Sequence, residues 1–160
     1  MSQWYKKADD DADFMHIDPE ENWEEAEQAD QVFKSEGIRY GRDKNVSQVA
    51  IENGVVIGAL ASGWDRDNGY GEDVMVFSFD LVVKPEFRRQ GVGLKLIQDA
   101  IKKYNQEKMD FQESGDRTMM RIWVVNPILI PVLERFGFTI ESSYEVDGLG
   151  NPGSAHLIAY

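Results

Sequence analysis

Apolar residues along this chain follow two spacings, one typical of β-strands and the other of α-helices. The clearest strand is expected over 74–83, a run rich in β-branched and aromatic residues that stops before Pro85, which cannot donate to a central ladder. After Gly93 the apolar residues recur at helical spacing, which predicts a helix over 93–104. Residues 88–93 therefore join a strand to a helix through a short turn that contains two glycines.

The same spacings, together with turn and capping signals, predict the order of the remaining elements. Asn53-Gly54 is a strong hairpin signal between two strands. The expected strands cover 3–8, 46–51, 55–61, 74–83, 119–125, 138–146 and 155–160, and the expected helices cover 9–15, 18–37, 93–104 and a short segment after Asn126-Pro127. The chain shows no internal repeat and no linker, so a single domain is expected over 1–160.

The helix expected over 18–37 has clear signals at both ends. Asp18 suits the N-cap, Pro19 the first helical position and Glu21 a capping box. Gly37 marks its end. The residues expected near one face are Trp23, Ala26, Asp30 and Phe33. The opposite face is almost wholly acidic, so only a narrow apolar stripe is available for packing.

Composition excludes several classes of protein and site. The chain has 160 residues and 42% hydrophobic content, enough for a core, and it has no cysteine, which excludes disulfides and thiolate sites. The first thirty residues are polar and acidic, which argues against a signal peptide, and no apolar run reaches membrane-spanning length. A cytoplasmic protein that binds no membrane is therefore expected.

The net charge of −12 is concentrated near the start of the chain. Residues 1–36 hold twelve acidic and three basic side chains, and thus nine of the twelve excess negative charges. This field disfavours contact with nucleic acid and favours a cationic partner. The alternative interpretation, an acidic surface that serves solubility alone, agrees equally well with the sequence.

Acidic residues in the loop over 64–73 suggest a calcium site at first sight. The EF-hand pattern needs a ligand at position 69 and a glycine at position 70, whereas the chain has Gly69 and Tyr70. We therefore interpret the segment as the loop of a β-hairpin and predict no metal site there.

The turn over 88–93 carries the strongest functional signal. Backbone N–H groups at a strand-to-helix turn lie at the positive end of the helix dipole and can bind an anion. The dinucleotide pattern G-x-G-x-x-G fails at Leu96, and the Gly-Lys-Ser/Thr of a phosphate loop is absent. The stretch instead resembles the acetyl-CoA signature of the GNAT N-acetyltransferases, R/Q-x-x-G-x-G/A after a strand ending in L-x-V-x-P. The matching residues are Leu81, Val83, Pro85, Arg88, Gly91 and Gly93.

A second stretch is similar to another landmark of that family, N-x-x-A-x-x-L-Y-x-x-x-G-F. Asn126 begins the match and Gly137-Phe138 ends it. Over 74–138 the resemblance rests on these two motifs. In the rest of the chain it rests only on the order of the expected strands and helices. It implies an α/β (α+β) GNAT fold, whose mixed sheet of six or seven strands is splayed at the acetyl-CoA site and accompanied by about four helices. It also implies acetyl-CoA as the acyl donor and no metal.

In this family acetyl-CoA lies between the two strands that match 74–83 and 119–125. The resemblance implies that main-chain groups of Leu81 and Val83 pair with the pantetheine, and that N–H groups over 89–94 take the pyrophosphate. Asn126 and the helix after it would contact the pantetheine and sulfur end. The implied cofactor-binding residues are Leu81, Val82, Val83, Arg88, Arg89, Gln90, Gly91, Val92, Gly93, Leu94, Asn126 and Leu133.

The chain departs from the family at positions that often carry acid–base chemistry. The tyrosine that many members use as an acid maps onto Leu133, and Phe77 and Phe79 occupy the positions of the base in some members. Pro131, inside the short helix, is expected to bend it. Asp80 is the one ionisable side chain late in its strand. It is predicted either to bind or deprotonate the amine, or to be a carboxylate at the edge of the core.

Further candidates for the site come from loops. Tyr144 is the second predicted catalytic residue, and Tyr70, His156 and Tyr160 could also enter the site. The expected function is direct transfer of an acetyl group from acetyl-CoA to an amine, carried by a small cationic molecule or by a basic peptide or protein. The alternative is an acyl-CoA-binding sensor that does not catalyse. The sequence leaves open whether the protein is a monomer or a homodimer.

Overall fold

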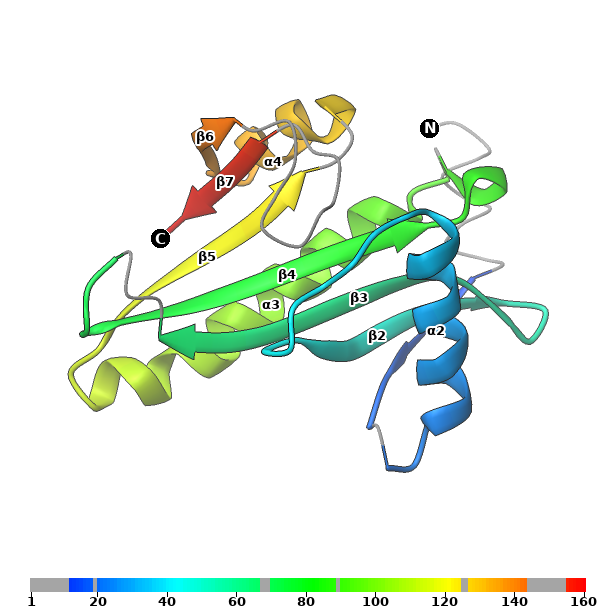
Figure 1. Cartoon of the computed structure of the whole chain (residues 1–160), viewed down its shortest axis with the longest axis horizontal. Coiled ribbons are helices and arrows are strands. Elements are labelled where there is room, and N and C mark those ends of the chain that lie inside the picture. Colours follow the sequence, from blue (N-terminus) through cyan, green and yellow to red (C-terminus); the bar gives the residue numbers. More distant parts are fainter. Residues whose placement is uncertain (1–11, 19, 67–69, 89, 125–126, 144–154) are drawn as a thin grey trace. The chain divides into compact units, whose positions relative to one another are not determined.

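The computed structural model describes residues 12–18, 20–66, 70–88, 90–124, 127–143 and 155–160. The described strands form a seven-stranded sheet in the order β1-β2-β3-β4-β5-β7-β6 (Figure 1). They are β1 (Asp13–His16), β2 (Asn45–Glu52), β3 (Val55–Arg66), β4 (Val74–Val83), β5 (Arg117–Val124), β6 (Thr139–Ser143) and β7 (Ala155–Ala159). The described helices are α2 (Trp23–Ser35), α3 (Val92–Glu113) and α4 (Ile130–Arg135), with 3-10 turns η1 (Pro85–Phe87) and η2 (Pro127–Leu129).

The sheet is mixed, as the sequence predicts. β4 and β5 are parallel, whereas the pairs β1–β2, β2–β3, β5–β7 and β6–β7 are antiparallel. A parallel pair needs a crossover connection, and α3 supplies it between β4 and β5. The α/β class and the seven strands are therefore confirmed. None of the described helices is long and apolar enough to span a membrane.

The chain forms two compact units. The first comprises Met1–Ile38, Asn45–Ser62 and Leu81–Lys102, and the second comprises Arg39–Lys44, Gly63–Asp80 and Lys103–Tyr160. The single domain expected over 1–160 stays a prediction. In the first unit, α2 lies in front of the strands and the first half of α3 lies behind them (Figure 1). The helical residues buried there are Ala29, Val32 and Phe33 of α2 and Val92, Leu96, Ile97 and Ala100 of α3.

Alternate residues of β4 point to opposite faces of the sheet. In the second unit one of these faces is aromatic. Phe77 lies 5.2 Å from Trp64 and 6.0 Å from Tyr104 between ring centroids, and Phe79 meets Phe138 edge-on at 6.1 Å. The two phenylalanines are thus core residues, which accounts for their place in an otherwise aliphatic strand.

The opposite face of β4 changes character along the strand. Val74 and Val76 pack with Met119 in an apolar cluster at its start. Ser78 and Asp80 follow on the same face, and both are buried. This face is therefore apolar where β4 begins, polar at Ser78 and Asp80, and apolar again at Val82, which is buried.

The start of the described chain differs from the expectation. Residues Asp13–His16 form strand β1, antiparallel to β2, where the sequence predicts a turn of helix over 9–15. The prediction was wrong because so short a segment does not reveal its period, and pairing with β2 satisfies its backbone groups. The strand predicted over 3–8 and Pro19, expected at the first helical position, lie outside the described residues.

The helix α2 begins later than predicted. Asp18 caps a turn that precedes the helix, since its Oδ1 accepts a hydrogen bond from the backbone N–H of Glu20 at 3.0 Å. The N-cap residue is Asn22, so the predicted capping box with Glu21 does not form. Trp23, expected on the buried face, is 59% exposed. Because the helix begins at Trp23, that residue lies in its first turn, whereas the buried residues of α2 come later in the helix.

The end of α2 agrees with the sequence prediction, whereas the end of α3 does not. Gly37 follows α2 as predicted, and its φ of +70° is one that glycine adopts without strain. The helix α3 continues past 104, where a polar loop is predicted. Its extension is supported by Trp64, whose Nε1 donates a hydrogen bond to Glu107 at 3.1 Å and whose ring lies 4.6 Å from that of Phe111. Tertiary contacts therefore support the helix past 104, and it ends at a local turn in which Gly115 has a φ of +94°.

The expected bend at Pro131 is also wrong. The helix α4 begins at Ile130, after η2, so Pro131 lies in its first turn. A backbone N–H in that turn has no intrahelical acceptor, and proline therefore removes no helical hydrogen bond there.

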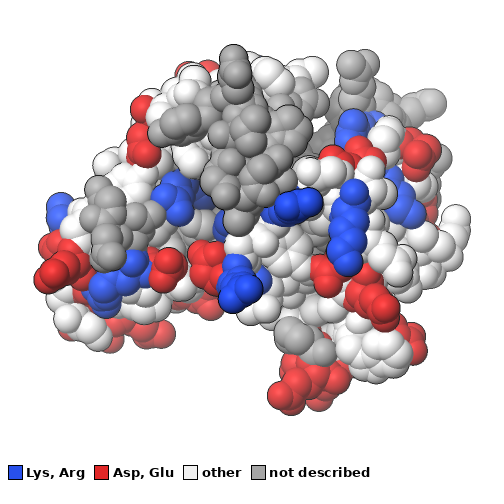
Figure 2. Space-filling model, viewed as in Figure 1, with Lys and Arg blue, Asp and Glu red and all other residues white. Residues whose placement is uncertain are grey.

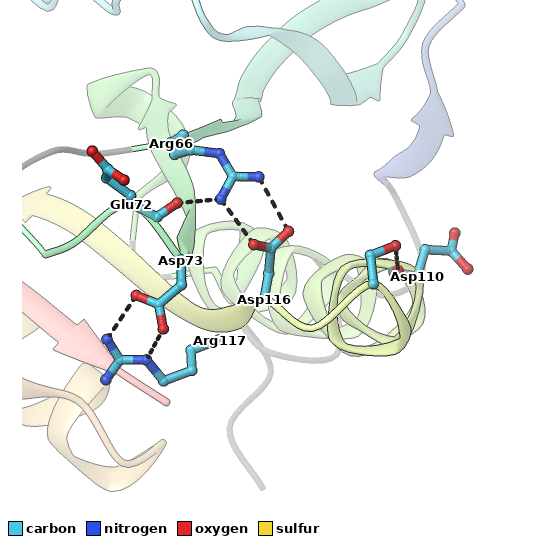
Figure 3. A network of polar contacts seen from close by, with 7 residues as sticks. Arg66, Glu72, Asp73, Asp110, Asp116 and Arg117 are labelled. Atoms are coloured by element: carbon cyan, nitrogen blue, oxygen red, sulfur yellow. Dashed lines mark hydrogen bonds and ion pairs between the residues drawn. The ribbon is translucent and has the colours of Figure 1, made fainter.

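Four charged side chains form two ion pairs in the second unit (Figure 3). One pair joins the end of β3 to the turn between α3 and β5, and the other joins the segment before β4 to the first residue of β5. Arg66 pairs with Asp116 at 2.8 and 3.1 Å, and Arg117 pairs with Asp73 at 3.0 and 3.1 Å. Both are two-point contacts between a guanidinium and a carboxylate. The hydrogen bonds from Arg117 and Arg66 hold the pKa of Asp73 and Asp116, respectively, below the ordinary value of 3.8.

These pairs should make the stability of the fold sensitive to acid. Because the folded-state pKa of each carboxyl lies below its unfolded value, the stabilisation is present above that unfolded value and is lost as the pH falls through the folded one. We expect the double change Arg66→Gln with Arg117→Gln to lower the urea midpoint of unfolding at neutral pH, by a difference that shrinks as the pH falls below 3.8. A difference that persists at low pH would show that the arginines stabilise the fold through other contacts.

Candidate functional site

The end of β4 extends beyond its register with β5. The two strands pair in parallel, and among the described residues this register ends at Phe79 and Ile122. β4 itself continues to Val83. The main chain of Leu81, Val82 and Val83 lies past that register, where an extended ligand can hydrogen-bond to it as an added strand.

The loop after β4 is fixed by hydrogen bonds within the first unit. Lys84 N donates to Ile57 O at 2.8 Å, which ties the loop to β3. Arg88 Nε donates to Val83 O at 3.1 Å, and the same guanidinium forms an ion pair with Glu36 at the end of α2. The phosphate contact implied for Arg88 stays a prediction. In this structure the Arg88 side chain links the loop after β4 to the end of that strand and to α2.

The turn into α3 has the backbone that an anion site requires. Gly91 has a φ of +86°, which L side chains rarely adopt, and the helix begins directly after it at Val92. Lys95 N donates to Gly91 O at 3.0 Å as the first helical hydrogen bond. The N–H groups of Val92 to Leu94 precede that bond and have no acceptor within the helix, so they are available to an anion at its positive end.

Gly93 differs from Gly91 in an informative way. It has no positive φ, and a Cβ placed on it would meet only Val83, at an ordinary contact distance of 3.8 Å. The fold alone therefore does not require glycine at this position. Close approach of a ligand to the first turn of α3 would require it.

The N-terminus of α3 packs against β3 at Gly58. A Cβ at this position would lie 3.1 Å from both Val82 O and Val92 Cγ1, closer than most real contacts. Any larger residue would therefore push against Val82 and Val92, and the close approach that Gly58 allows sets the position of the turn at 91–93. The sequence gives no signal for this role, because Gly58 stands in a strand pattern far along the chain from α3.

Substitution of Gly58 tests this packing. We expect Gly58→Val to destabilise the fold by about 1–3 kcal/mol, because the added methyl groups overpack the contact with Val92. Displacement of Val92 should also weaken binding of an anionic ligand at the turn. Urea unfolding and ligand titration measure the two effects.

Gly93→Ala is the matched control for that change. Its Cβ has room, and alanine is favoured over glycine inside a helix by about 1 kcal/mol. Gly93→Ala should therefore keep or raise the free energy of unfolding. Equal destabilisation by both substitutions would contradict the packing described for Gly58.

Asp80 is a buried carboxylate with a cationic partner. Its Oδ2 lies 3.0 Å from Lys44 Nζ, and the two side chains are 10% and 12% exposed. Asp80 therefore holds a primary ammonium group, which is the chemistry that an amine acceptor presents. Lys44 could not be singled out from the sequence, because it stands among several charged residues before β2 and belongs to no motif.

The positions at which relatives carry an acid or a base are core positions here. Phe77 and Phe79 lie in the aromatic cluster, and Leu133 of α4 is fully buried. None of these three side chains can exchange a proton, so the departures seen in the sequence are real differences in chemistry. The predicted site residues Arg89, Asn126 and Tyr144 lie outside the described residues.

The remaining candidates are placed in the second unit. Tyr70 OH donates a hydrogen bond to Glu141, and burial together with that carboxylate raises the pKa of Tyr70 to about 12. A phenol so weakly acidic is a poor proton donor to a thiolate whose conjugate thiol titrates near about 8.5. His156 packs edge-on against Trp123, and Tyr160 is exposed. In the described part of the chain, no group of three or more potential ligand side chains is arranged to hold a metal ion.

Solved structures resemble the chain over most of its length. Arabidopsis thaliana Naa50 in complex with the bisubstrate analogue CoA-Ac-MVNAL is 14% identical, with a TM-score of 0.63 over 94% of this chain and 99% of that one. Arabidopsis thaliana NAA60 in complex with acetyl-CoA is 16% identical, with a TM-score of 0.63 over 92% and 97%. FeeM, an N-acyl amino acid synthase from uncultured soil microbes, is 11% identical, with a TM-score of 0.62 over 93% and 89%. At these identities the likeness shows the fold.

Sequence comparison assigns the family. No curated protein matches the chain significantly. A family model for the acetyltransferase (GNAT) family matches residues 5–138, which include β4, the turn at 88–93 and α4. Because this match spans most of the chain and the fold agrees with it, the chain belongs to the GNAT family of acetyltransferases.

Proposed function

We propose that this chain is an acetyl-CoA-dependent N-acetyltransferase that passes the acetyl group directly to a primary amine. The observation that carries the proposal is the turn from β4 into α3. There Gly91, with its positive φ, precedes a 22-residue helix whose first N–H groups have no acceptor within the helix and can bind an anion. The turn comes directly after the end of β4, which extends past its register with β5. The pyrophosphate of acetyl-CoA suits the helix end, and its pantetheine arm suits the strand end. The complexes of Naa50 and NAA60 support the same donor.

The chemistry is an acyl transfer from sulfur to nitrogen. The amine nitrogen bonds to the thioester carbonyl carbon, the C–S bond breaks with its electrons on sulfur, and the nitrogen loses its excess protons. A lysine-like amine titrates near about 10.4, so its neutral form costs roughly 4 kcal/mol at neutral pH. We assign Asp80 to bind the acceptor ammonium and to receive a proton from it, because it is a buried carboxylate that already holds an ammonium.

The absence of an acid at Leu133 does not prevent turnover. A general acid contributes roughly 10²–10⁴-fold to a rate. Holding the two reactants together reaches effective molarities of about 10⁵ M or more, and a thiol that titrates near about 8.5 leaves without much help. Proximity can therefore supply more of the rate than the missing acid removes. We expect a working enzyme whose chemical step is slower than that of a relative with an acid.

Two assays on the wild-type protein test the proposal. Millimolar acetyl-CoA should raise the melting temperature, because a ligand that binds only the folded state stabilises it. Thiol release should then depend on an added amine, and mass spectrometry should find the N-acetylated product. The absence of any thermal shift would remove the basis of the proposal.

A second function is favoured by one specific observation. Leu133 is fully buried, and Asp80 is already paired with Lys44, so the described residues show no side chain ready to exchange a proton with substrate. A binding module that senses acyl-CoA without turnover would have such a site. A thermal shift with acetyl-CoA, combined with no acetylated product from any amine, would favour this function.

The acidic segment that leads into α2 supports a cationic acceptor. Figure 2 shows acidic side chains gathered over the region of α2. The tested residues are Glu20, Glu21, Glu24 and Glu25, each changed to glutamine. We expect the acceptor's KM to rise roughly three- to tenfold at low salt, with kcat and the KM for acetyl-CoA almost unchanged, because electrostatic steering acts on encounter.

Salt dependence provides the control for this prediction. Attraction between exposed charges is screened over about 10 Å at 0.1 M salt, so the difference between variant and wild type should disappear as salt is added. An unchanged acceptor KM at low salt would mean that these carboxylates serve solubility alone.

A further inference from the structure

The segment that carries Lys44 packs directly against β3, and this packing places Lys44 beside Asp80. The contact is at Gly63, where an added Cβ would lie 1.7 Å from Asp43 O and 2.7 Å from Asp43 C. No other residue fits at Gly63 unless this segment moves. The segment over 39–44 thus packs closely against β3 at Asp43, the residue before Lys44. From this position Lys44 Nζ lies 3.0 Å from Asp80 Oδ2. All four residues belong to the second unit.

Stability alone is a weak explanation for this ion pair. Removing two charges from water costs several kcal/mol, and buried pairs often contribute no net stability. A second observation points to a ligand at the same place. The Ser78 hydroxyl lies two residues before Asp80 on the same face of β4, is 3% exposed, and has no hydrogen-bond partner among the described residues. Buried hydroxyls normally have a partner.

The position in the sheet agrees with a ligand site. Ser78 and Asp80 lie toward the carboxyl end of β4, which is parallel to β5. In open α/β sheets, ligands bind outside the carboxyl ends of the parallel strands. Asp80 is the first residue of β4 past its register with β5, whereas Ser78 lies within that register, so Asp80 is where the fold would place the charged group of an acceptor.

We propose that Asp80 is the ammonium site for the acceptor, and that Lys44 is an internal occupant which the acceptor must displace. The inference rests on the proposed function and deepens it by naming the acceptor class, a primary alkylammonium on a straight methylene chain. Lys44 itself presents an ammonium on a four-carbon stem. An acceptor with an ammonium group on a methylene chain replaces both the ammonium and the methylene stem of Lys44. The buried charge of Asp80 is therefore compensated before and after the exchange. A neutral acceptor lacks that compensation.

Lys44 then determines the apparent affinity for the acceptor. When a binding-competent state is populated a tenth of the time, apparent affinity falls about tenfold. We expect Lys44→Ala to raise kcat/KM for n-butylamine about tenfold, mainly through a lower KM. Lys44→Arg should act in the opposite direction and raise the KM, because a guanidinium binds a carboxylate through two hydrogen bonds. A merely structural ion pair would not give opposite signs for the two substitutions.

Lys103→Ala is the matched control. Lys103 is also an ion-paired lysine of the second unit, with its Nζ 3.3 Å from Glu107 in α3. Its loss removes a lysine and an ion pair without changing Asp80. The kinetics with n-butylamine should remain those of the wild type.

A measurement without turnover separates this inference from the proposed function. Lys44→Ala leaves Asp80 without its ammonium, so its melting temperature should fall, and n-butylammonium should raise it again by more than it raises that of the wild type. The double change Lys44→Ala with Asp80→Asn should lose this response. Methylammonium, which has no stem, should act more weakly at the same concentration.

The possible outcomes lead to different conclusions. If amines are acetylated but neither substitution at Lys44 alters the KM, the internal-occupant inference is wrong and the proposed function stands. If n-butylammonium stabilises Lys44→Ala selectively but no amine is acetylated, the ammonium site stands and the proposed function fails. Should both substitutions raise the KM, Lys44 supports the site instead of competing for it, and the inference is overturned.

Discussion

Acetyl-CoA should no longer raise the melting temperature of the protein once Gly91 is replaced by aspartate. Gly91 has a φ of +86°, and the N–H groups of the first turn of α3 follow it directly. A carboxylate there strains the turn and repels the pyrophosphate. Two unit charges about 4 Å apart interact by roughly 4 kcal/mol near a protein surface, which corresponds to about a thousandfold loss of affinity. Gly93→Asp, at a residue with ordinary φ, should show the effect of charge without that strain.

Gly115→Asp is the control for backbone strain. Gly115 also has a positive φ, +94°, and open space around its Cα, but it lies after the end of α3. This variant should melt at a lower temperature and still be stabilised by acetyl-CoA. Wild-type affinity in both Gly91→Asp and Gly93→Asp would contradict the assignment of the turn as the pyrophosphate site.

Asp80→Asn should lower kcat by about 10²–10⁴-fold, the range for loss of a group that accepts a proton in catalysis. The amide has nearly the shape of the carboxylate but can neither take a proton nor balance an ammonium. The acceptor's KM should rise as well. The dependence of that KM on salt concentration, which comes from the exposed carboxylates, should remain. Steady-state kinetics over a range of pH and ionic strength measure all three quantities.

Loss of folding is the alternative explanation to exclude for this variant. Removing one partner of a buried ion pair can cost about 3–5 kcal/mol, because Lys44 would be left charged and unpaired. The double change Lys44→Met with Asp80→Asn removes both charges and should recover much of that stability. It should remain as slow as Asp80→Asn. Near wild-type kcat in the double variant would show that Asp80 has no part in the reaction.

The parts of the fold that could be predicted were those with local signals. The strand over 74–83, the hairpin at Asn53-Gly54 and the turn at Gly91 into α3 each depend on neighbours in sequence, and the described residues show all three. The family resemblance followed from the same turn, because its glycines and the preceding strand lie within one continuous stretch. The class of the sheet was implied by the family resemblance, with which the expected element order agreed.

The parts that failed depend on contacts between distant residues. α3 continues past 104, where Trp64 packs on it, and no local pattern reveals that contact. Asp18 looks like an N-cap, yet it caps a turn because the helix is positioned by its packed face further on. The partner of Asp80 was missed for the same reason, since Lys44 reaches it only through a segment held against Gly63.

The most direct test of the central claim is acetylation of a defined amine by the purified protein. With acetyl-CoA and n-butylamine, the account predicts one free thiol for each N-acetylbutylamine detected by mass spectrometry, at a rate proportional to protein concentration and abolished by Gly91→Asp. If folded protein binds acetyl-CoA but yields no acetylated product from n-butylamine, longer diamines or lysine-containing peptides, the claim that it is an N-acetyltransferase is contradicted.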